Sequence, residues 1–324
     1  MKTLILGAGV VGTVYAWQMS QAGYDVTLWV RQGKREQVEK EGVHIRCTDS
    51  RGKKNEQLDT VYRPKVVDDV SPEDGYQLII VCVKSNQVEP VLPMLAERLG
   101  KADVLFFQNN WWGDEKIKQH LPPSRCLFGF SRVVGGWKTD NGIECMLFNS
   151  PGMATMLGEK DGQNSSRLEK IEEMMKKSGM KPEISPNILG WLATHYVEYL
   201  GATGAILKAG SAKDFAKNSS LVKEAILATR EGLDVCRARG IDVGKSAPQN
   251  LKLYGLPLFV LVPIGQWQYG MANIQLFFDE VTAHNMDEAS AQYYDVLNEG
   301  GRLGIKMPFL RGFEKFYQEY RKGL

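Results

Sequence analysis

Several features that mark specialised classes of protein are scarce or absent in this sequence. Its five cysteines are an odd number without CxxC spacing, which fits a reducing cytosol and suggests neither a disulfide framework nor a metal site. The longest apolar run, at residues 256–265, is broken by prolines and falls far short of the roughly 20 residues a membrane span needs. Repeats and low-complexity tracts are also missing. These absences exclude secreted disulfide scaffolds, membrane spans and repeat architectures.

An excess of charge of either sign is missing as well. The 40 basic and 38 acidic residues leave a net charge of +2, so no general field recruits nucleic acid or a membrane surface. A length of 324 residues with 43% hydrophobic residues is comfortable for two domains. The apolar start runs at once into glycines, which predicts a buried strand rather than a signal peptide. We expect a soluble cytoplasmic protein.

A nucleotide-binding motif opens the chain. Residues 3–6 (TLIL) predict a strand, GAGVVG follows at 7–12, a helical pattern ends near Gly23, and residues 25–30 predict a second strand. The order strand, GxGxxG, helix, strand within about 30 residues is the context in which this motif binds a dinucleotide.

Each glycine of the motif has a distinct predicted role. Gly7 permits the tight turn, Gly9 lets the backbone approach a pyrophosphate, and Gly12 lets the helix pack closely on the strand. The N-terminus of the helix supplies N–H donors to the phosphate. The predicted cofactor contacts of this loop are Gly7, Ala8, Gly9, Val10, Val11 and Gly12.

The residues after the second strand predict which dinucleotide is bound. NAD-binding chains usually place Asp or Glu there, whereas here VRQGKR at 30–35 has three cations and no acid. Arg31 suits a 2′-phosphate best, because its planar guanidinium can form two charge-assisted hydrogen bonds. We therefore predict NADP(H); the alternative is a solvated basic loop.

The α/β pattern continues with apolar strands at residues 77–83 and 103–107. Such strands alternating with helices predict a parallel sheet of the Rossmann-type, doubly wound class, with its ligand at the carboxyl ends of the strands. Lys84 and Asn109 stand at those ends, where they could meet the nicotinamide or the substrate. Residues 125–148 and 154–160 are expected to add antiparallel strands, and residues 165–179 a surface helix.

The second half is predicted to be helical. After a proline-containing linker, helical patterns cover residues 220–243 and 272–305, the latter as helices joined near His284. We expect an NADP-binding Rossmann-like domain at 1–183 and an all-helical substrate domain at 184–324, with the active site in a cleft between them.

In combination these motifs resemble the ketopantoate reductase (2-dehydropantoate 2-reductase) family over nearly the whole chain. The resemblance rests on GAGVVG, Arg31, VKSNQ at 83–87, QN at 108–109 and the C-terminal stretch 287–308. It implies that NADPH reduces the carbonyl of a 2-keto acid while a protein group protonates the oxygen. It also places Glu288 where the family keeps a substrate-binding glutamate.

The sequence departs from the family where the proton donor is expected. The resemblance implies a lysine two residues after a tryptophan in the first long helix of the second domain, with asparagines one and two turns further on. Counted from Trp191, these positions are Ala193, Val197 and Gly201, none of which can donate a proton. We therefore expect a divergent member of the family that lacks its catalytic lysine.

His195 is the nearest titratable replacement for that lysine. Residues 187–206 predict one buried helix, in which His195 is offset from position 193 by about 200° and shares a face with Trp191 and Glu198. Glu198 could hold one ring nitrogen while the other protonates an alkoxide. The alternative is a core histidine that only satisfies a hydrogen bond.

Other candidates remain beside His195. Lys84 is the second candidate donor or substrate anchor, with a solvated lysine as the alternative, and Glu288 competes with an ordinary surface acid. Trp111 and Trp112 either wall the pocket or pack beneath a loop, and residues 257–270 either cover the active site or form a homodimer face.

Three rivals to the predicted NADPH-dependent oxidoreductase stay open. One is an authentic 2-dehydropantoate 2-reductase with a substituted donor, and another is an opine-type dehydrogenase. The third is a catalytically silent NADPH-binding sensor. The substrate, the direction of the reaction and the oligomeric state are not determined by the sequence.

Overall fold

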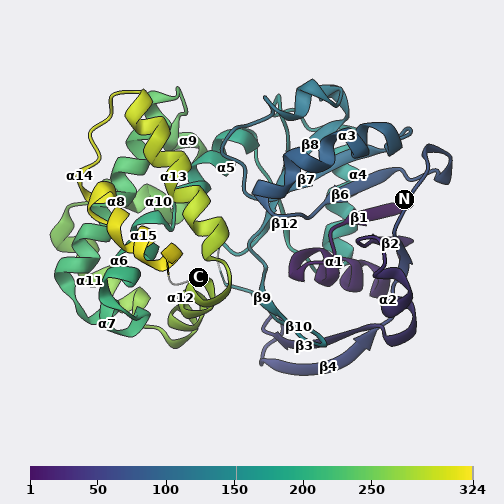
Figure 1. The fold of residues 1–324 in the computed structure, drawn as a ribbon, viewed down its shortest axis with the longest axis horizontal. Coiled ribbons are helices and arrows are strands. Elements are labelled where there is room, and N and C mark those ends of the chain that lie inside the picture. The colour runs from purple at the N-terminus through teal and green to yellow at the C-terminus, as the bar shows by residue number, and fades with distance from the viewer. Residues whose placement is uncertain (151, 323–324) are drawn as a thin grey trace. The chain divides into compact units, whose positions relative to one another are not determined.

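The protein was analysed as a computed structural model that describes residues 1–150 and 152–322. The chain forms two compact units, Met1–Leu189 and Gly190–Leu324, here called unit 1 and unit 2 (Figure 1). Unit 1 is an α/β unit built on a mostly parallel sheet and unit 2 is helical, so the predicted fold class is confirmed.

Unit 1 contains, within its described residues, an eight-stranded main sheet with the order β12-β11-β8-β7-β6-β1-β2-β5. Its strands are β1 (Thr3–Leu6), β2 (Val26–Trp29), β5 (Lys65–Val67), β6 (Leu78–Val81), β7 (Asp103–Phe107), β8 (Cys126–Ser131), β11 (Thr155–Glu159) and β12 (Pro182–Ile184). The strands from β5 to β8 in this order are all parallel, and only β11 and β12 run the other way. The expected antiparallel strands are therefore confirmed for the pair β8–β11, whereas β8 also continues the parallel part of the sheet through β7.

A second sheet of unit 1 was only half predicted. Its strands are β3 (Val43–Asp49), β4 (Glu56–Tyr62), β9 (Val134–Thr139) and β10 (Gly142–Leu147), in the order β4-β3-β10-β9. The β9–β10 hairpin is antiparallel as expected, but β10 also pairs in parallel with β3, a strand that the sequence did not reveal. Two hairpins far apart in the chain thus make one sheet.

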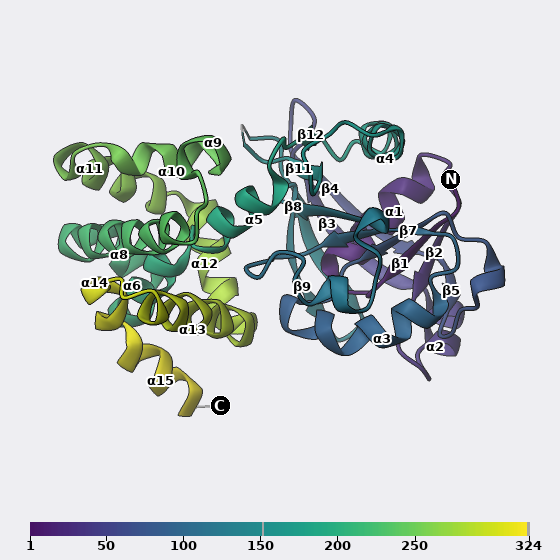
Figure 2. The same ribbon diagram turned by 90° about the horizontal axis from the view of Figure 1, so that it is seen from above.

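The helices of unit 1 cover both faces of the main sheet. They are α1 (Val10–Gln21), α2 (Arg35–Glu41), α3 (Val88–Arg98) and α4 (Ser166–Lys177), and short 3-10 turns occur at Pro72–Asp74, Ser85–Gln87, Ile117–Gln119 and Pro123–Arg125. Figure 2 shows α3 and α4 on opposite sides of the main sheet, which is the doubly wound arrangement.

Helix α1 lies between the main sheet and the second sheet. One side packs on β1 and β2 and the other on β9 and β10, so residues Gly12 to Met19 are all buried. A helix that is apolar all round must be covered on every side, and this sequence (VVGTVYAWQM) meets that condition. Its one buried phenol, Tyr15, forms hydrogen bonds with Ser131 and Thr155, and burial raises its pKa.

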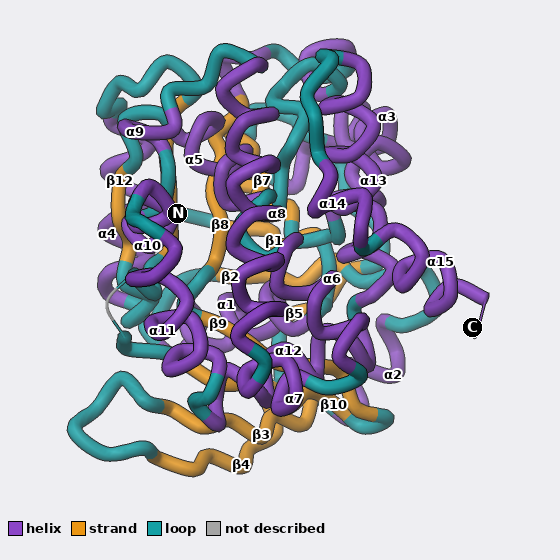
Figure 3. The backbone as a smooth tube through the Cα atoms, turned by 90° about the vertical axis from the view of Figure 1, so that its left-hand side faces the viewer, coloured by secondary structure: helices purple, strands orange, loops and turns teal. Residues whose placement is uncertain are grey.

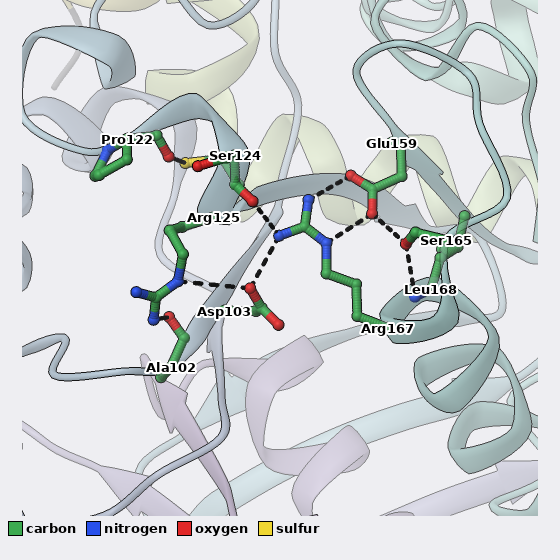
Figure 4. A network of polar contacts seen from close by, with 10 residues as sticks. Ala102, Asp103, Pro122, Ser124, Arg125, Glu159, Ser165, Arg167 and Leu168 are labelled. Atoms are coloured by element: carbon green, nitrogen blue, oxygen red, sulfur yellow. Dashed lines mark hydrogen bonds and ion pairs between the residues drawn. The ribbon is translucent and has the colours of Figure 1, made fainter.

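A charged network ties α4 to three strands at the edge where β7 and β8 begin (Figure 4). Nη1 of Arg167 lies 2.9 Å from Asp103 Oδ1, and Nη2 lies 2.5 Å from Glu159 Oε2. The Ser124 carbonyl accepts from the same guanidinium, and Ser165 donates to Glu159. Because these hydrogen bonds and charges favour the cation, they raise the pKa of Arg167. This network fixes the edge opposite the predicted cofactor site.

Unit 2 is a helical bundle around α8, which lies between α6 and α11 (Figure 3). Its helices are α5 (Ile188–Tyr196, which begins in unit 1), α6 (Leu200–Ala209), α7 (Ala212–Lys217), α8 (Ser219–Ala238), α9 (Val243–Ser246), α10 (Gln249–Lys252), α11 (Leu258–Tyr269), α12 (Ala272–His284), α13 (Met286–Arg302), α14 (Pro308–Gly312) and α15 (Glu314–Lys322). The junction of α12 and α13 at Asn285 is as predicted. None of the described helices combines the length and apolar character that a bilayer crossing requires.

The single helix expected over residues 187–206 was wrong. The chain leaves the helical path at Val197–Tyr199, so α5 and α6 are separate helices. The N–H of Glu198 bonds to the carbonyl of His195 at 3.0 Å, which is a tight turn rather than continued α-helix.

We predict that Arg167→Met lowers the free energy of unfolding by about 3 kcal/mol, because it leaves two carboxylates in the network without their shared cation. Urea unfolding followed by circular dichroism measures this. Lys177→Met on the same helix is the matched control, since its partner Glu173 is exposed and the loss should not be measurable. Equal effects of the two substitutions would contradict the role assigned to the network.

Candidate active site

The carboxyl ends of the central parallel strands lie level with one another. Leu6 of β1 pairs with Trp29 of β2 and with Val81 of β6, and Val81 pairs with Phe106 of β7. The residues that follow these strands therefore line one edge of the sheet. The chain leaves β1 toward β2 on one side and later returns to β6 on the other, which makes β1 the topological switch point where α/β sheets bind ligands.

The three glycines of the loop at this edge differ in whether the fold itself requires them. Gly7 has a φ of +110°, and a Cβ on it would lie 3.0 Å from the carbonyl carbon of Cys82. A Cβ on Gly12 would lie 2.1 Å from the carbonyl oxygen of Gly7. Both positions thus require glycine for the fold itself. A Cβ on Gly9 would meet nothing within 4 Å, so the fold leaves open space there.

That open space adjoins the N-terminus of α1. Gly9 is the N-cap residue, no side chain caps the helix, and its first turn carries no acid. The free N–H groups and the helix dipole favour an anion at this position. Ala8, Val10 and Val11 belong to the same loop and first turn, as predicted. The residues present therefore fit a dinucleotide whose pyrophosphate approaches Gly9.

Arg31 lies on the surface just after β2 and near two other cations. In the described part of the chain no carboxylate holds its guanidinium, whereas Arg35 pairs with Glu39 at 2.8 Å. Partial burial, together with the charges of Arg31 and Lys34, lowers the pKa of the Lys138 ammonium group on β9. The sequence did not single out Lys138, because β9 reaches this place only through the second sheet.

Three polar side chains follow the next two strands. Lys84 is half-buried at the start of the Ser85–Gln87 turn after β6, and Asn109 is half-buried after β7. Gln108, which the sequence analysis did not select, is buried, and its Oε1 has no hydrogen-bond partner in the described structure. A buried carbonyl oxygen at the ligand-binding edge is suited to accept a hydrogen bond from a bound molecule.

The two tryptophans that follow differ in environment. Trp111 is 1% exposed, while Trp112 is 40% exposed. Trp112 is therefore the more accessible of the two residues that the sequence analysis considered for a pocket wall.

His195 and Glu198 form a buried pair in unit 2. The His195 Nδ1 atom lies 2.7 Å from Glu198 Oε2, and the two side chains are 4% and 3% exposed. The Trp191 ring stacks on the imidazole at a centroid distance of 4.9 Å, and Tyr199 meets it edge-on at 5.9 Å. Because a carboxylate only accepts, the hydrogen of this bond resides on Nδ1, and the carboxylate fixes the ring's tautomer and orientation.

Two further tyrosines surround this pair and were missed in the sequence. Tyr254 and Tyr269 are hydrogen-bonded to each other, and burial raises the pKa of both phenols. The negative charge of Glu198 acts on both in the same direction. Tyr254 lies in the 3-10 turn before α11, and Tyr269 is the last residue of α11. No local sequence pattern connects either tyrosine with His195.

Glu288 lies near Tyr196 of α5, the residue next to His195. Tyr196 donates to Asp295 Oδ2 of α13 at 2.7 Å, and burial followed by the charges of Asp295 and Glu288 raises the Tyr196 pKa. Glu288 is half-buried in the first turn of α13. His195 thus pairs with Glu198, whereas Glu288 acts through its charge on the neighbouring Tyr196.

The positions that the family resemblance assigns to chemistry serve helix packing here. A Cβ on Gly201 would lie 2.1 Å from the carbonyl oxygen of Ala225 in α8, so that position cannot hold any side chain. A Cβ on Gly232 of α8 would lie 3.0 Å from the Cβ of Val197. Ala193 is buried and its carbonyl accepts from the thiol of Cys236 at 3.6 Å. These three positions are thus occupied by contacts with α8.

In the described residues, no group of three or more His, Cys, Asp or Glu side chains is arranged to hold a metal ion. The fold and the glycine loop together define unit 1 as a dinucleotide-binding unit of the Rossmann type.

Comparisons with known proteins make this more specific. A model of the family described as ketopantoate reductase PanE/ApbA matches residues 3–148. A 2-dehydropantoate 2-reductase of Pyrococcus horikoshii is 27% identical over 252 residues, which cover 74% of this chain and 75% of the relative. The resemblance inferred from the sequence is thus confirmed, both by the match of residues 3–148 to this family model and by relatives named 2-dehydropantoate 2-reductase.

Solved structures share the fold over the full length. D-mandelate dehydrogenase with NADH and anilino(oxo)acetate gives a TM-score of 0.74 at 17% identity, covering 100% of this chain and 99% of that one. A ketopantoate reductase of Staphylococcus aureus, described as dimeric, gives 0.68 at 15% identity, covering 100% and 99%.

We predict opposite outcomes for alanine at two glycines of the loop. Gly9→Ala should leave the urea midpoint unchanged but weaken dinucleotide binding at least about tenfold, since its methyl group fills the space that a phosphate needs. Gly12→Ala should lower the stability by more than about 2 kcal/mol, because its methyl group meets the Gly7 carbonyl. Cofactor fluorescence titration and urea unfolding measure the two effects. A Gly9→Ala protein that binds normally would show that the open space serves no ligand.

Proposed function

We propose that the protein is an NADPH-dependent oxidoreductase that transfers a hydride to the carbonyl of a small 2-keto acid or a related ketone. The observation that carries the proposal is the space left by Gly9 at the uncapped N-terminus of α1. Packing does not require glycine at this position, and the space beside it would accept a pyrophosphate.

The preference for NADPH over NADH is supported by the cations at the adenosine end. Arg31 has no carboxylate partner among the described residues, and Lys34 and Lys138 lie close enough for their charges to interact. A 2′-phosphate would relieve the repulsion among these cations and would form charge-assisted hydrogen bonds. The NADH in the D-mandelate dehydrogenase structure makes NADH the competing cofactor to test.

The substrate class is supported by the names of the relatives and of the fold neighbours. Dehydropantoate is a 2-keto acid and mandelate is a 2-hydroxy acid, so both names describe the same interconversion. An authentic 2-dehydropantoate 2-reductase with a substituted donor is one form of this proposal. An opine-type dehydrogenase is a more distant alternative.

NADPH, when bound, supplies the hydride, and we assign the proton to His195. Glu198 holds the Nδ1–H, so Nε2 is the ring atom that would give its proton to the developing alkoxide. The adjacent carboxylate then stabilises the imidazolium that precedes transfer. Lys84 would anchor the substrate carboxylate or serve as an alternative proton donor. Asn109 would bind the nicotinamide or the substrate. Glu288 would accept a hydrogen bond from a substrate hydroxyl.

A catalytically silent NADPH sensor is the rival from a different class, favoured by the apolar residues at 193, 197 and 201. It predicts tight cofactor binding and no oxidation with any carbonyl compound. We also propose a cytoplasmic location, supported by five cysteines that are all free thiols, and a homodimer, supported by the dimeric fold neighbour.

We predict that Arg31→Ala raises the Kd for NADPH about 10- to 100-fold and changes the Kd for NADH less than about threefold, because only NADPH carries the phosphate that the guanidinium binds. Fluorescence titration with both cofactors measures this. Arg35→Ala is the control, since Arg35 is held by Glu39. Wild-type protein that binds NADH as tightly as NADPH would refute the assigned preference.

We predict that His195→Gln lowers kcat by about 100-fold or more, the usual size of a general-acid contribution, while the Kd for NADPH stays the same. Turnover against a panel of 2-keto acids that includes ketopantoate measures kcat. His284→Gln is the control, because that histidine is exposed and pairs only weakly with Glu280 at 3.4 Å. If folded His195→Gln protein kept most of its turnover, His195 would not be the donor.

A further inference from the structure

One stretch of unit 2 carries no charged side chain and no histidine. Residues 253–278 contain no Asp, Glu, Lys, Arg or His, in a chain of which 24% is charged. The stretch includes the 3-10 turn Leu253–Gly255, all of α11 and the first half of α12. On a protein surface, such a run without charge is typical of a segment that is covered by another molecule.

The inner face of α11 is firmly held by unit 2. Leu261 is buried, and a Cβ on Gly265 would lie 2.9 Å from Val222 of α8, so the helix lies close on its neighbour. Arg230 of α8 donates to the carbonyls of Tyr254 and Leu256 and thereby fixes the approach to α11. The helix is therefore a rigid element.

The outer face of α11 is as apolar as the inner one. Phe259 is 79% exposed and Trp267 is 69% exposed, and the exposed Pro263 lies between them at helical spacing. A helix that is apolar on all sides is normally covered on all sides. We call the exposed apolar side chains of this region the α11 patch: Leu253, Leu256, Phe259, Pro263, Ile264 and Trp267.

We propose that the α11 patch is the surface through which a second copy of this chain docks. The proposal gives a surface to the homodimer proposed above and rests on it. In a two-fold dimer the same patch meets itself, so any charge would face a like charge near the axis. A patch without charge is free of that repulsion and is complementary to its own copy.

The size of the patch also fits a second copy. Phe259 and Trp267 alone leave on the order of 300 Å² exposed, given the areas of aromatic side chains. A standard interface buries about 800 Å² per partner and uses about 20–30 residues on each side. Only the outward-facing residues of 253–278 can contribute to it, so the α11 patch would form the apolar centre of such an interface. Exposed aromatic anchors of this kind also carry most of the energy at interfaces.

A lipid surface is less well matched than a second copy. Helices that lie on membranes carry Lys and Arg along the polar side of their apolar face. No such residue occurs between 253 and 278.

The test measures the mass of the full-length protein in solution by sedimentation equilibrium, over a range of concentrations. We expect the wild type to have twice the chain mass of 36.3 kDa. Phe259→Glu and Trp267→Glu should each weaken association by about 30-fold or more, as expected for a hot-spot residue. Val61→Glu is the matched control, because Val61 is 48% exposed but lies on β4 in unit 1. It should leave the dimer unchanged.

Each other outcome overturns the proposal. A wild type that is monomeric at all concentrations overturns it, and so does a dimer that survives both glutamate substitutions or dissociates with Val61→Glu. A monomer that instead co-sediments with phosphatidylglycerol vesicles assigns the patch to lipid. NADPH binding and 2-keto acid turnover are measured on the same samples. A failure of the docking surface is thus distinguished from a failure of the proposed enzymatic function.

Discussion

The close approach of α1 to β1 is the contact on which unit 1 depends. A Cβ on Gly12 would lie 2.1 Å from the carbonyl oxygen of Gly7, so the helix can lie this near the strand only with glycine at position 12. Because α1 is this close, its first turn begins at the carboxyl edge of the main sheet, and its far side remains available to the second sheet. The same contact therefore positions the anion-binding N-terminus and makes room for the β9–β10 hairpin that carries Lys138. The fold itself requires glycine at position 12, whereas the glycine at position 9 is accounted for by the cofactor binding proposed above.

Unit 2 depends on an equally close contact, that of Gly201 with the Ala225 carbonyl oxygen in α8. Here the close packing excludes functional side chains instead of positioning them. Gly201 and Gly232 bring α6 and the preceding turn at Val197 onto α8, and the places where the family resemblance implies polar side chains become packing positions. Volume excludes an asparagine at 201, so its loss cannot be reversed by a single substitution. The tight turn at Val197–Tyr199, in contrast, brings Glu198 back onto His195. The region therefore has packing positions where the resemblance implies polar side chains. It also contains a different polar pair, His195 and Glu198.

The sequence predicted unit 1 well because its signals are local. The glycine loop and the apolar strands each lie within a few residues of the element they determine, so β1, α1, β2, β6 and β7 could be predicted before the structure. The second sheet could not, because β3 and β10 pair across about 100 residues and neither strand is strongly apolar along its length. The break after Tyr196 was also missed, since no proline or glycine occurs between residues 191 and 200 to mark it. Tyr254 and Tyr269 join His195 only through the tertiary packing of α11. Because the break after Tyr196 was missed, the helical face predicted for His195 was derived for an unbroken helix.

The burial of the His195–Glu198 pair bears on whether the pair serves catalysis or stability. Removing a carboxylate from water costs several kcal/mol, and a buried pair often does no better for stability than apolar side chains of the same volume. Its surroundings, Trp191 and Tyr199 among them, would accommodate such side chains. A structural histidine would also be satisfied by a backbone carbonyl, without a second charge to desolvate. A carboxylate on Nδ1 adds something that stability does not need, because it fixes the tautomer and the orientation of the ring. The expense of this arrangement favours chemistry over packing, and it does so at the one helix where the related enzymes are expected to hold their proton donor.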